Sequence, residues 1–397
     1  MWIPVDDKLS TFTLPRRRAP SRDGVHVFFE ELFPRCQRDD EFARYRNLVF
    51  FNLPFFRFPD HCDADGLIFN SRYLMECFGY EAFLHGAALP PMTDAPLELP
   101  LLDFPDGYPS VGGRLARNAL RALAGQVHLG HALRGGKPDP FATLSIMHHL
   151  NQLAAQRSTR SFLLMIAARD LPQFEQAARD MPIPHSTIES LLPVHHLENR
   201  SVVAAMRHAT FSLCYDVFVE AFGFYPVESV YCGCPVFSNG NGNLRYLLPP
   251  GAGIEVRDQL QMHFGPVEAR VRAYRPVAER VFRVVTAVEG ARLCQRGARY
   301  IDRHYSKAAF AHRIGRFLRD TRDRPARTPP AAGRHAQISP YLRLADWRRG
   351  RFVTDRGKLE VPAEVAAAWK RLLSSKRPRR GGDGPPMPPE VGGLRPA

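Results

Sequence analysis

Val219–Asn243 reads VEAFGFYPVESVYCGCPVFSNGNGN and is the stretch that decides the fold. Glu220 and Glu228 stand in it with seven residues between them. We expect a strand over 211–219, a helix of about two turns that stops at Gly233, and a second strand after it. This order predicts a βαβ unit with both glutamates at the carboxyl edge of a parallel sheet, where open α/β folds bind ligands.

The chain on either side of this stretch alternates short apolar runs with helical patterns. Strand and helix follow one another at regular spacing, which predicts a parallel, doubly wound sheet. The predicted strands cover 127–129, 162–167, 187–194, 211–219 and 253–256, and the predicted helices cover 140–157, 172–181, 198–208, 267–288 and 291–318.

A second and shorter set of elements precedes residue 96. We expect a helix over 25–42, strands over 47–56, 65–70 and 81–85, and a helix over 71–79 that Ser71 caps. A complete Rossmann-like domain needs more residues than these, and no glycine-rich loop occurs before residue 50. The sequence therefore predicts an N-terminal domain that is reduced, or whose beginning lies upstream of Met1.

Composition divides the chain further. The net charge is +14, and residues 325–397 carry 15 Lys and Arg against 6 Asp and Glu, or +9 of that total. We expect four parts: a partial N-terminal domain over 1–95, a linker and basic helix over 96–124, a C-terminal domain over 125–320, and a basic Pro/Arg/Gly-rich tail over 321–397. The tail composition predicts a largely disordered segment with one short helix over 361–373.

Cysteine usage and hydropathy indicate the compartment. The seven cysteines are scattered without zinc-site or paired spacing, and no run of about 18 apolar residues occurs. The N-terminal residues carry acids and no apolar core of a secretory signal. We expect a reduced, cytoplasmic protein. Its basic tail suits contact with an anionic surface, such as the inner face of a membrane, and no specific nucleic-acid recognition is expected.

The opening stretch resembles the glutamate–seven–glutamate signature of retaining GT-B glycosyltransferases of the group 1, or family 4, type. The matching positions share one register with the E-x-F-G-x-x-x-x-E and G-x-P-V patterns of that family, and they are Glu220, Phe222, Gly223, Glu228, Gly233, Pro235 and Val236. The alternative is an ordinary βαβ crossover that carries a surface pair of glutamates. The resemblance implies a two-domain GT-B enzyme with its donor site in the C-terminal domain.

The resemblance also implies roles for single residues in binding a nucleotide-sugar donor. Glu220 would contact the donor sugar as the catalytic-site carboxylate, and Glu228 would accept hydrogen bonds from the ribose hydroxyls. Backbone N–H groups around Phe222, Gly223 and Phe224 would donate further hydrogen bonds to the sugar and phosphate of the donor.

The loop over 130–137 resembles the family's glycine-arginine…lysine loop, whose cations hold the donor diphosphate. Lys137 stands at about the family spacing, but His131 replaces the arginine. Arg134 offers a substitute charge, and His131 offers one only when it is protonated. The alternative is a solvated Gly/Arg/Lys turn.

The implied reaction moves a hexose or similar sugar with retention of configuration. It needs no cofactor, and the absence of a DxD pair at a predicted strand end favours a metal-independent mechanism. The acceptor stays open among a polysaccharide, a lipid-linked sugar, a protein and a small metabolite. Two other functions stay open: a non-catalytic GT-B-like binding or scaffold protein, and a surface binder that acts through the tail.

Overall fold

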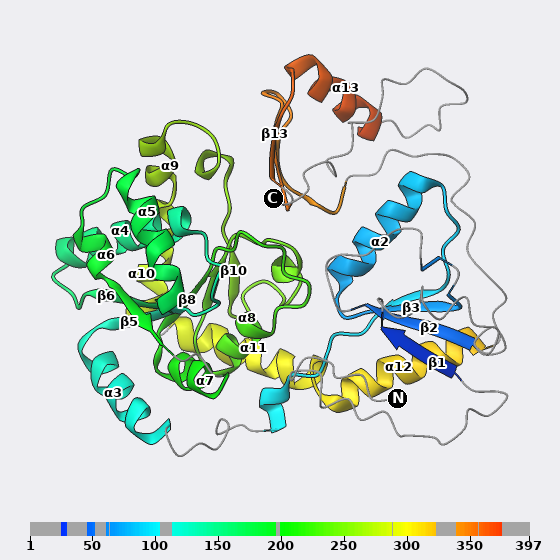
Figure 1. Ribbon diagram of the computed structural model, residues 1–397, viewed down its shortest axis with the longest axis horizontal. Coiled ribbons are helices and arrows are strands. Elements are labelled where there is room, and N and C mark those ends of the chain that lie inside the picture. The colour runs from blue at the N-terminus through cyan, green and yellow to red at the C-terminus, as the bar shows by residue number, and fades with distance from the viewer. Residues whose placement is uncertain are drawn as a thin grey trace.

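The structure is a computed structural model. It describes residues 25–29, 46–51, 61–62, 64–103, 113–195, 199–287, 289–322, 339–355 and 357–374. Two α/β domains, each built on a parallel sheet, lie side by side, and a smaller C-terminal unit lies beside both (Figure 1). No helix in these ranges is long and apolar enough to cross a membrane.

The N-terminal domain contains a four-stranded parallel sheet in the order β1-β2-β3-β4. Its fully buried aromatic side chains include Phe51, Phe69 and Phe78, whose ring centroids lie at most 5.6 Å apart in stacked or tilted pairs. Its elements are β1 (Val25–Phe29), β2 (Arg46–Phe51), β3 (Gly66–Phe69), α2 (Arg72–His85), β4 (Met92–Asp94) and η2 (Pro100–Asp103).

Two predictions for this domain are wrong. Val25–Phe29 is a strand and not part of a helix, because its β-branched and aromatic residues pair in parallel with β2; residues 30–42 lie outside the described ranges. The segment 81–85 is not a strand, because α2 continues through Gly79 and ends at Gly86, which has a left-handed backbone. Ser71 is the helix cap, as predicted, and its Oγ accepts the N–H of Leu74.

The C-terminal domain contains a six-stranded parallel sheet in the order β10-β9-β8-β5-β6-β7, with helices on both faces. The predicted doubly wound sheet is confirmed. Its elements are α3 (Gly113–Gln126), β5 (His128–Ala132), α4 (Pro140–Gln156), β6 (Phe162–Ala167), η3 (Ala168–Asp170), α5 (Leu171–Arg179), α6 (Ser186–Glu189), β7 (Leu191–Val194), α7 (Asn199–His208), β8 (Phe211–Cys214), α8 (Phe224–Tyr231), β9 (Val236–Ser238), η4 (Asn243–Arg245), β10 (Ile254–Val256), η5 (Leu260–Met262), α9 (Val267–Ala273), α10 (Arg275–Thr286), α11 (Glu289–His304) and α12 (Lys307–Arg322).

Helix α12 joins the two domains by packing on the N-terminal one. Phe310 meets Phe50 edge-on with ring centroids 6.4 Å apart, and Phe317 lies against Gly66 so closely that a Cβ there would be 3.0 Å from its ring. The apolar stripe of this helix is therefore a packing surface, as its spacing predicts. The domains also meet where Ser71 Oγ donates to the backbone oxygen of Ala221, 2.6 Å away.

The prediction of a largely disordered tail is wrong for residues 339–374. Residues 339–355 and 357–374 form a three-stranded antiparallel sheet and a helix, which we call the C-terminal module. Trp347 and Trp369 both pack against Phe352 in this small core, and Trp369 lies on the predicted helix, which is confirmed. The module consists of β11 (Leu342–Asp346), β12 (Arg351–Thr354), β13 (Gly357–Glu360) and α13 (Ala363–Ser374).

Candidate functional site

A pocket of about 610 Å³ opens at the carboxyl edge of the six-stranded sheet. Five of the eight residues predicted for the donor site line it: Arg134, Lys137, Glu220, Phe224 and Glu228. The remaining lining comes from the ends of β5, β6 and β7 and from α7 and α8, and consists of Leu133, Gly135, Ala167, Ala168, Arg169, Val194, His195, Val202 and Tyr225.

Glu220 is held by its backbone in a loop, not by a strand. Strand β8 ends at Cys214, earlier than predicted, because the chain then pairs with the loop after β5, where Pro138 and Asp216 form a bridge. Glu220 itself pairs with Gly242, and its carbonyl accepts the N–H of Asn243 at 2.7 Å. The Gly/Asn loop over residues 238–243 therefore fixes the position of this glutamate.

The glutamate carboxylate meets two cations from the loop after β5. Lys137 Nζ lies 3.2 Å from Glu220 Oε2, and Arg134 forms ion pairs with both Glu220 and Asp216. The Arg134 side chain is only 7% exposed and is surrounded by carboxylates, whereas that of Lys137 is 40% exposed. Arg134 therefore fixes the position of Glu220, and Lys137 is the more exposed cation of this loop.

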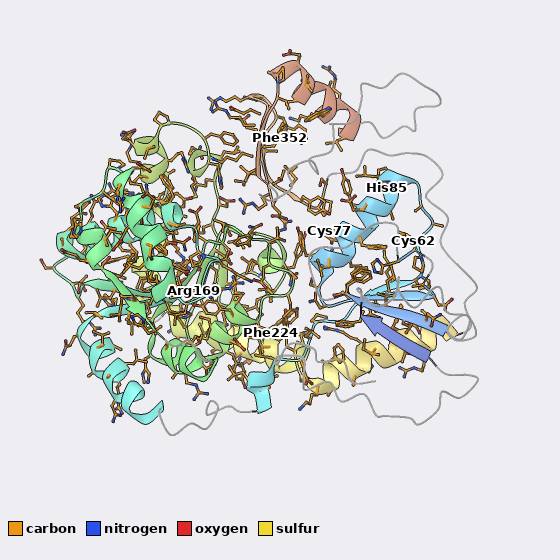
Figure 2. All side chains as sticks on the ribbon, viewed as in Figure 1. Cys62, Cys77, His85, Arg169, Phe224 and Phe352 are labelled. Atoms are coloured by element: carbon orange, nitrogen blue, oxygen red, sulfur yellow. The ribbon has the colours of Figure 1, made fainter. Side chains whose placement is uncertain are left out.

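Arg169 is a pocket cation that the sequence reading missed. It lies in η3, two residues after the end of β6. Its Nη2 donates to the backbone oxygen of Gly135 at 2.9 Å, and 75% of its side chain is exposed. Figure 2 shows it on the C-terminal domain, to which Phe224 also belongs. The sequence could have indicated this residue, because it comes shortly after a buried strand, and the carboxyl ends of parallel strands meet at the edge of the sheet where ligands bind. Arg169 and Lys137 together supply two accessible positive charges.

Helix α8 places the second glutamate and an aromatic wall. It begins after Gly223, whose φ of 107° suits glycine, and Glu228 lies one turn in, 7% exposed and at the pocket lining. Phe224 lines the pocket as well. Phe222 and Gly223 do not: Phe222 is buried against Phe224, with ring centroids 4.5 Å apart.

His131 is a structural residue and not a phosphate ligand. Strand β5 runs on to Ala132, farther than predicted, because Gly130 packs directly on the ring of Phe211 and keeps the chain in the sheet. The His131 ring is wholly buried between the Tyr225 hydroxyl and Ser229 Oγ, 3.1 Å away. Burial lowers its pKa to about 3, so the ring is neutral and cannot provide the charge expected of it.

Asp216 is a second residue that the sequence reading missed. It is buried, and burial raises the pKa of its carboxyl while Arg134 opposes that rise. Its backbone oxygen accepts the side-chain amides of Asn239 and Asn241 at 2.9 and 3.2 Å. The Gly/Asn loop thus holds both acidic partners of Arg134.

His195 lines the pocket beside Val194, while His148 contacts His149 on α4. Within the described ranges no group of three His, Cys, Asp or Glu side chains has an arrangement that could hold a metal ion. The residues at the pocket are instead suited to an anionic, hydroxyl-bearing ligand: two accessible cations, a buried carboxylate and an aromatic wall.

The sequence matches none of the protein families or curated proteins with which it was compared. Solved structures resemble it. A UDP-forming α,α-trehalose-phosphate synthase from Burkholderia vietnamiensis aligns with a TM-score of 0.54 at 12% identity, covering 76% of this chain and 73% of that one. HepE from Anabaena, solved in complex with UDP and glucose, aligns with a TM-score of 0.51 at 11% identity, covering 74% and 78%.

The N-terminal domain of a Candida albicans trehalose-6-phosphate phosphatase aligns as well, with a TM-score of 0.52, 12% identity and coverage of 75% and 70%. These likenesses confirm the predicted fold class: α/β, GT-B, with two Rossmann-like domains and a shortened N-terminal one. At such low identity they establish the fold alone.

Proposed function

We propose that this protein is a glycosyltransferase that transfers a sugar from a nucleotide-sugar donor. The observation that carries the proposal is the meeting of Glu220, Lys137 and Glu228 at one pocket of a GT-B fold. The donor diphosphate would lie against Lys137 and Arg169, since charge-assisted hydrogen bonds to phosphate are strong. Glu228 would hold the ribose diol, and Glu220 the donor sugar.

The proposed chemistry is transfer with retention, as in the family 4 enzymes that the motif resembles. The bond between the sugar C1 and the leaving phosphate oxygen breaks, and the acceptor hydroxyl oxygen bonds to C1 on the same face. The hydroxyl proton passes to the leaving phosphate, so no separate base and no metal is required. The two accessible cations would stabilise the charge that builds on the leaving diphosphate.

The Arg134 ion pairs support different roles for Arg134 and Glu220 in the proposed site: Arg134 positions Glu220, and Glu220 contacts the donor sugar. A carboxylate held by two cations keeps a fixed position, and a pre-positioned group loses little entropy when substrate binds. Glu220 would therefore orient the donor sugar rather than exchange protons. Arg134 would not bind the donor phosphates, because its guanidinium already forms ion pairs with Asp216 and Glu220.

A donor panel tests the proposal. UDP-, GDP- and ADP-linked glucose and mannose are added to the full chain, and the thermal midpoint and release of nucleoside diphosphate are measured. One donor at saturating concentration is expected to raise the midpoint by about 2 °C or more. Glu220→Ala and Lys137→Ala should lose turnover, while Arg272→Ala, exposed on α9, should behave like the wild type.

Failure of every donor to stabilise the protein would refute the proposal. Wild-type binding and turnover in both site variants would refute the assignment of Glu220 and Lys137 to the site. Stabilisation without transfer or hydrolysis would leave a donor-binding protein that is not an enzyme. That outcome would establish the scaffold alternative.

A further inference from the structure

The C-terminal module belongs to neither Rossmann-like domain, yet it lies beside both (Figure 1). On the N-terminal side, the hydroxyl of Tyr341 donates to Glu81 of α2 at 3.1 Å. On the other side, Arg343 forms an ion pair with Asp258, which follows β10, at 3.3 Å. The module is therefore attached to the domain that carries the donor pocket as well as to the N-terminal one.

One buried carboxylate of the module, that of Asp355, faces the C-terminal domain. Asp355 directly follows β12, and its backbone N–H donates to the carbonyl of Tyr341 at 2.8 Å, which fixes the residue within the module. Arg245 Nη2 donates to Asp355 Oδ2 at 2.8 Å and to the carbonyl of Pro340 at 2.5 Å. The Asp355 side chain is fully buried. The module therefore binds Arg245, the last residue of η4, at two points.

The other end of η4 holds the loop of the donor pocket. Asn243, the first residue of η4, donates its backbone N–H to the carbonyl of Glu220 at 2.7 Å and its side-chain amide to that of Phe222 at 2.6 Å. Gly242, just before it, pairs with Glu220. Because η4 is three residues long, one short turn joins the contact with Asp355 to the contacts with Glu220.

The charges around Asp355 constrain where η4 can lie. Burial raises the pKa of its carboxyl, and the charges of Arg245 and Arg343 and the N–H of Gly242 oppose that rise. A buried pair of charges contributes little net stability, because desolvation offsets the attraction, but removing one member leaves the other charge buried and uncompensated. The pair therefore keeps the module and η4 in one relative position.

We propose that Asp355 is a positioning residue of the donor site, which acts through Arg245 and η4 to hold Glu220 in place for the donor sugar. The role of Glu220 toward a sugar rests on the proposed function, whereas the holding of its loop stands on the contacts alone. The groups proposed for the diphosphate and the ribose lie on other elements, after β5, in η3 and on α8. Loss of the Asp355 contact should therefore affect the sugar more than the nucleotide.

Hydrogen exchange on the full chain tests the positioning itself. Asp355→Asn and Arg245→Gln should each speed exchange in peptides over 238–245 about tenfold or more, while peptides of β6 keep the wild-type rate. Tyr341→Phe is the matched control, because it removes a module contact with the N-terminal domain and should leave 238–245 unchanged. Unchanged exchange over 238–245 in a folded variant overturns the inference. Loss of folding, or faster exchange throughout the C-terminal domain, in both variants overturns it as well.

Donor kinetics test the part that rests on the proposed function, with the stabilising donor of the panel and its nucleoside diphosphate as probes. In Asp355→Asn and Arg245→Gln, kcat should fall about tenfold or more, while the affinity for the diphosphate stays within about twofold of the wild type. The double variant should lose no more than either single variant, because the two residues act as one unit.

The outcomes separate this inference from the proposed function. If the wild type turns a donor over and both variants keep its kcat, or lose diphosphate affinity as strongly as kcat, only this inference fails. If the wild type binds no donor, the proposed function fails, and hydrogen exchange alone decides whether Asp355 holds the loop of Glu220.

Discussion

Lys137 Nζ lies 3.2 Å from Glu220 Oε2, although the two residues are 83 positions apart in the sequence. The contact joins the loop after β5 to Glu220, the first of the two glutamates in the stretch Val219–Asn243. Arg134 reaches the same carboxylate from its buried side. The two cations of this loop therefore differ in exposure. Arg134 is buried between the carboxylates of Asp216 and Glu220, whereas Lys137 is partly exposed at the pocket.

Arg169 should contribute to the affinity for a diphosphate. Its side chain is exposed at the pocket, so Arg169→Ala removes a cation without disturbing a core. We expect the affinity for UDP to fall about tenfold or more, and the affinity for uridine to stay unchanged. Calorimetry with both ligands measures this, with Arg179→Ala on α5 as the control. An equal loss for UDP and uridine would contradict a phosphate role.

Glu228 should recognise the ribose. Because a carboxylate accepts two hydroxyl donors, Glu228→Ala should lower the affinity for the donor nucleotide by roughly 10- to 100-fold. The 2′-deoxy nucleotide loses one of these donors, so the preference for the ribo form should shrink in the variant. Competition binding with both nucleotides checks the ratio. A ribose preference as strong in Glu228→Ala as in the wild type would rule this role out.

Gly242 should tolerate no side chain. Its φ is 62°, and a Cβ would lie 2.5 Å from the backbone oxygen of Glu220. Gly242→Ala should therefore destabilise the protein by about 2 kcal/mol or more and displace Glu220. Gly86 has a similar φ of 63° but open space around it, so Gly86→Ala should cost only about 1 kcal/mol. Urea unfolding compares the two, and equal losses would show that the contact with Glu220 is unimportant.

His131 should make stability depend on pH. Its folded pKa is about 3, below the ordinary 6.5, so the unfolded chain binds a proton more readily. Stability is then fully present above about pH 6.5 and falls as the pH drops toward 3, by up to roughly 5 kcal/mol. His131→Asn should flatten this slope in urea unfolding between pH 7 and 4. His185→Asn, at an exposed position, should keep the wild-type slope, and a steep slope in His131→Asn would refute the assignment.

The sequence was informative where local signals agree. Helix α8 contains Pro226 in its first turn and is followed by Gly233, whose φ is 91°. The boundaries of this helix were therefore predictable from its own residues. Glu220 and Glu228 accordingly both line the observed pocket.

The sequence misled where tertiary packing decides. Gly130 suggested a loop, but its contact with Phe211 extends β5 and buries His131. Arg169 belongs to no spacing pattern, and only folding brings it to Gly135. The C-terminal module was hidden by the Pro- and Arg-rich composition around it, because its core is a small aromatic cluster centred on Phe352.

The most direct measurement of the central claim is calorimetric titration of the donor nucleotide diphosphate into three proteins. These are the wild type, Lys137→Ala/Arg169→Ala, and the surface control Arg272→Ala/Arg275→Ala. If the diphosphate lies against the two accessible pocket cations, the first double variant should bind at least about 100-fold more weakly and the control should match the wild type. Equal affinity in all three proteins would contradict the account.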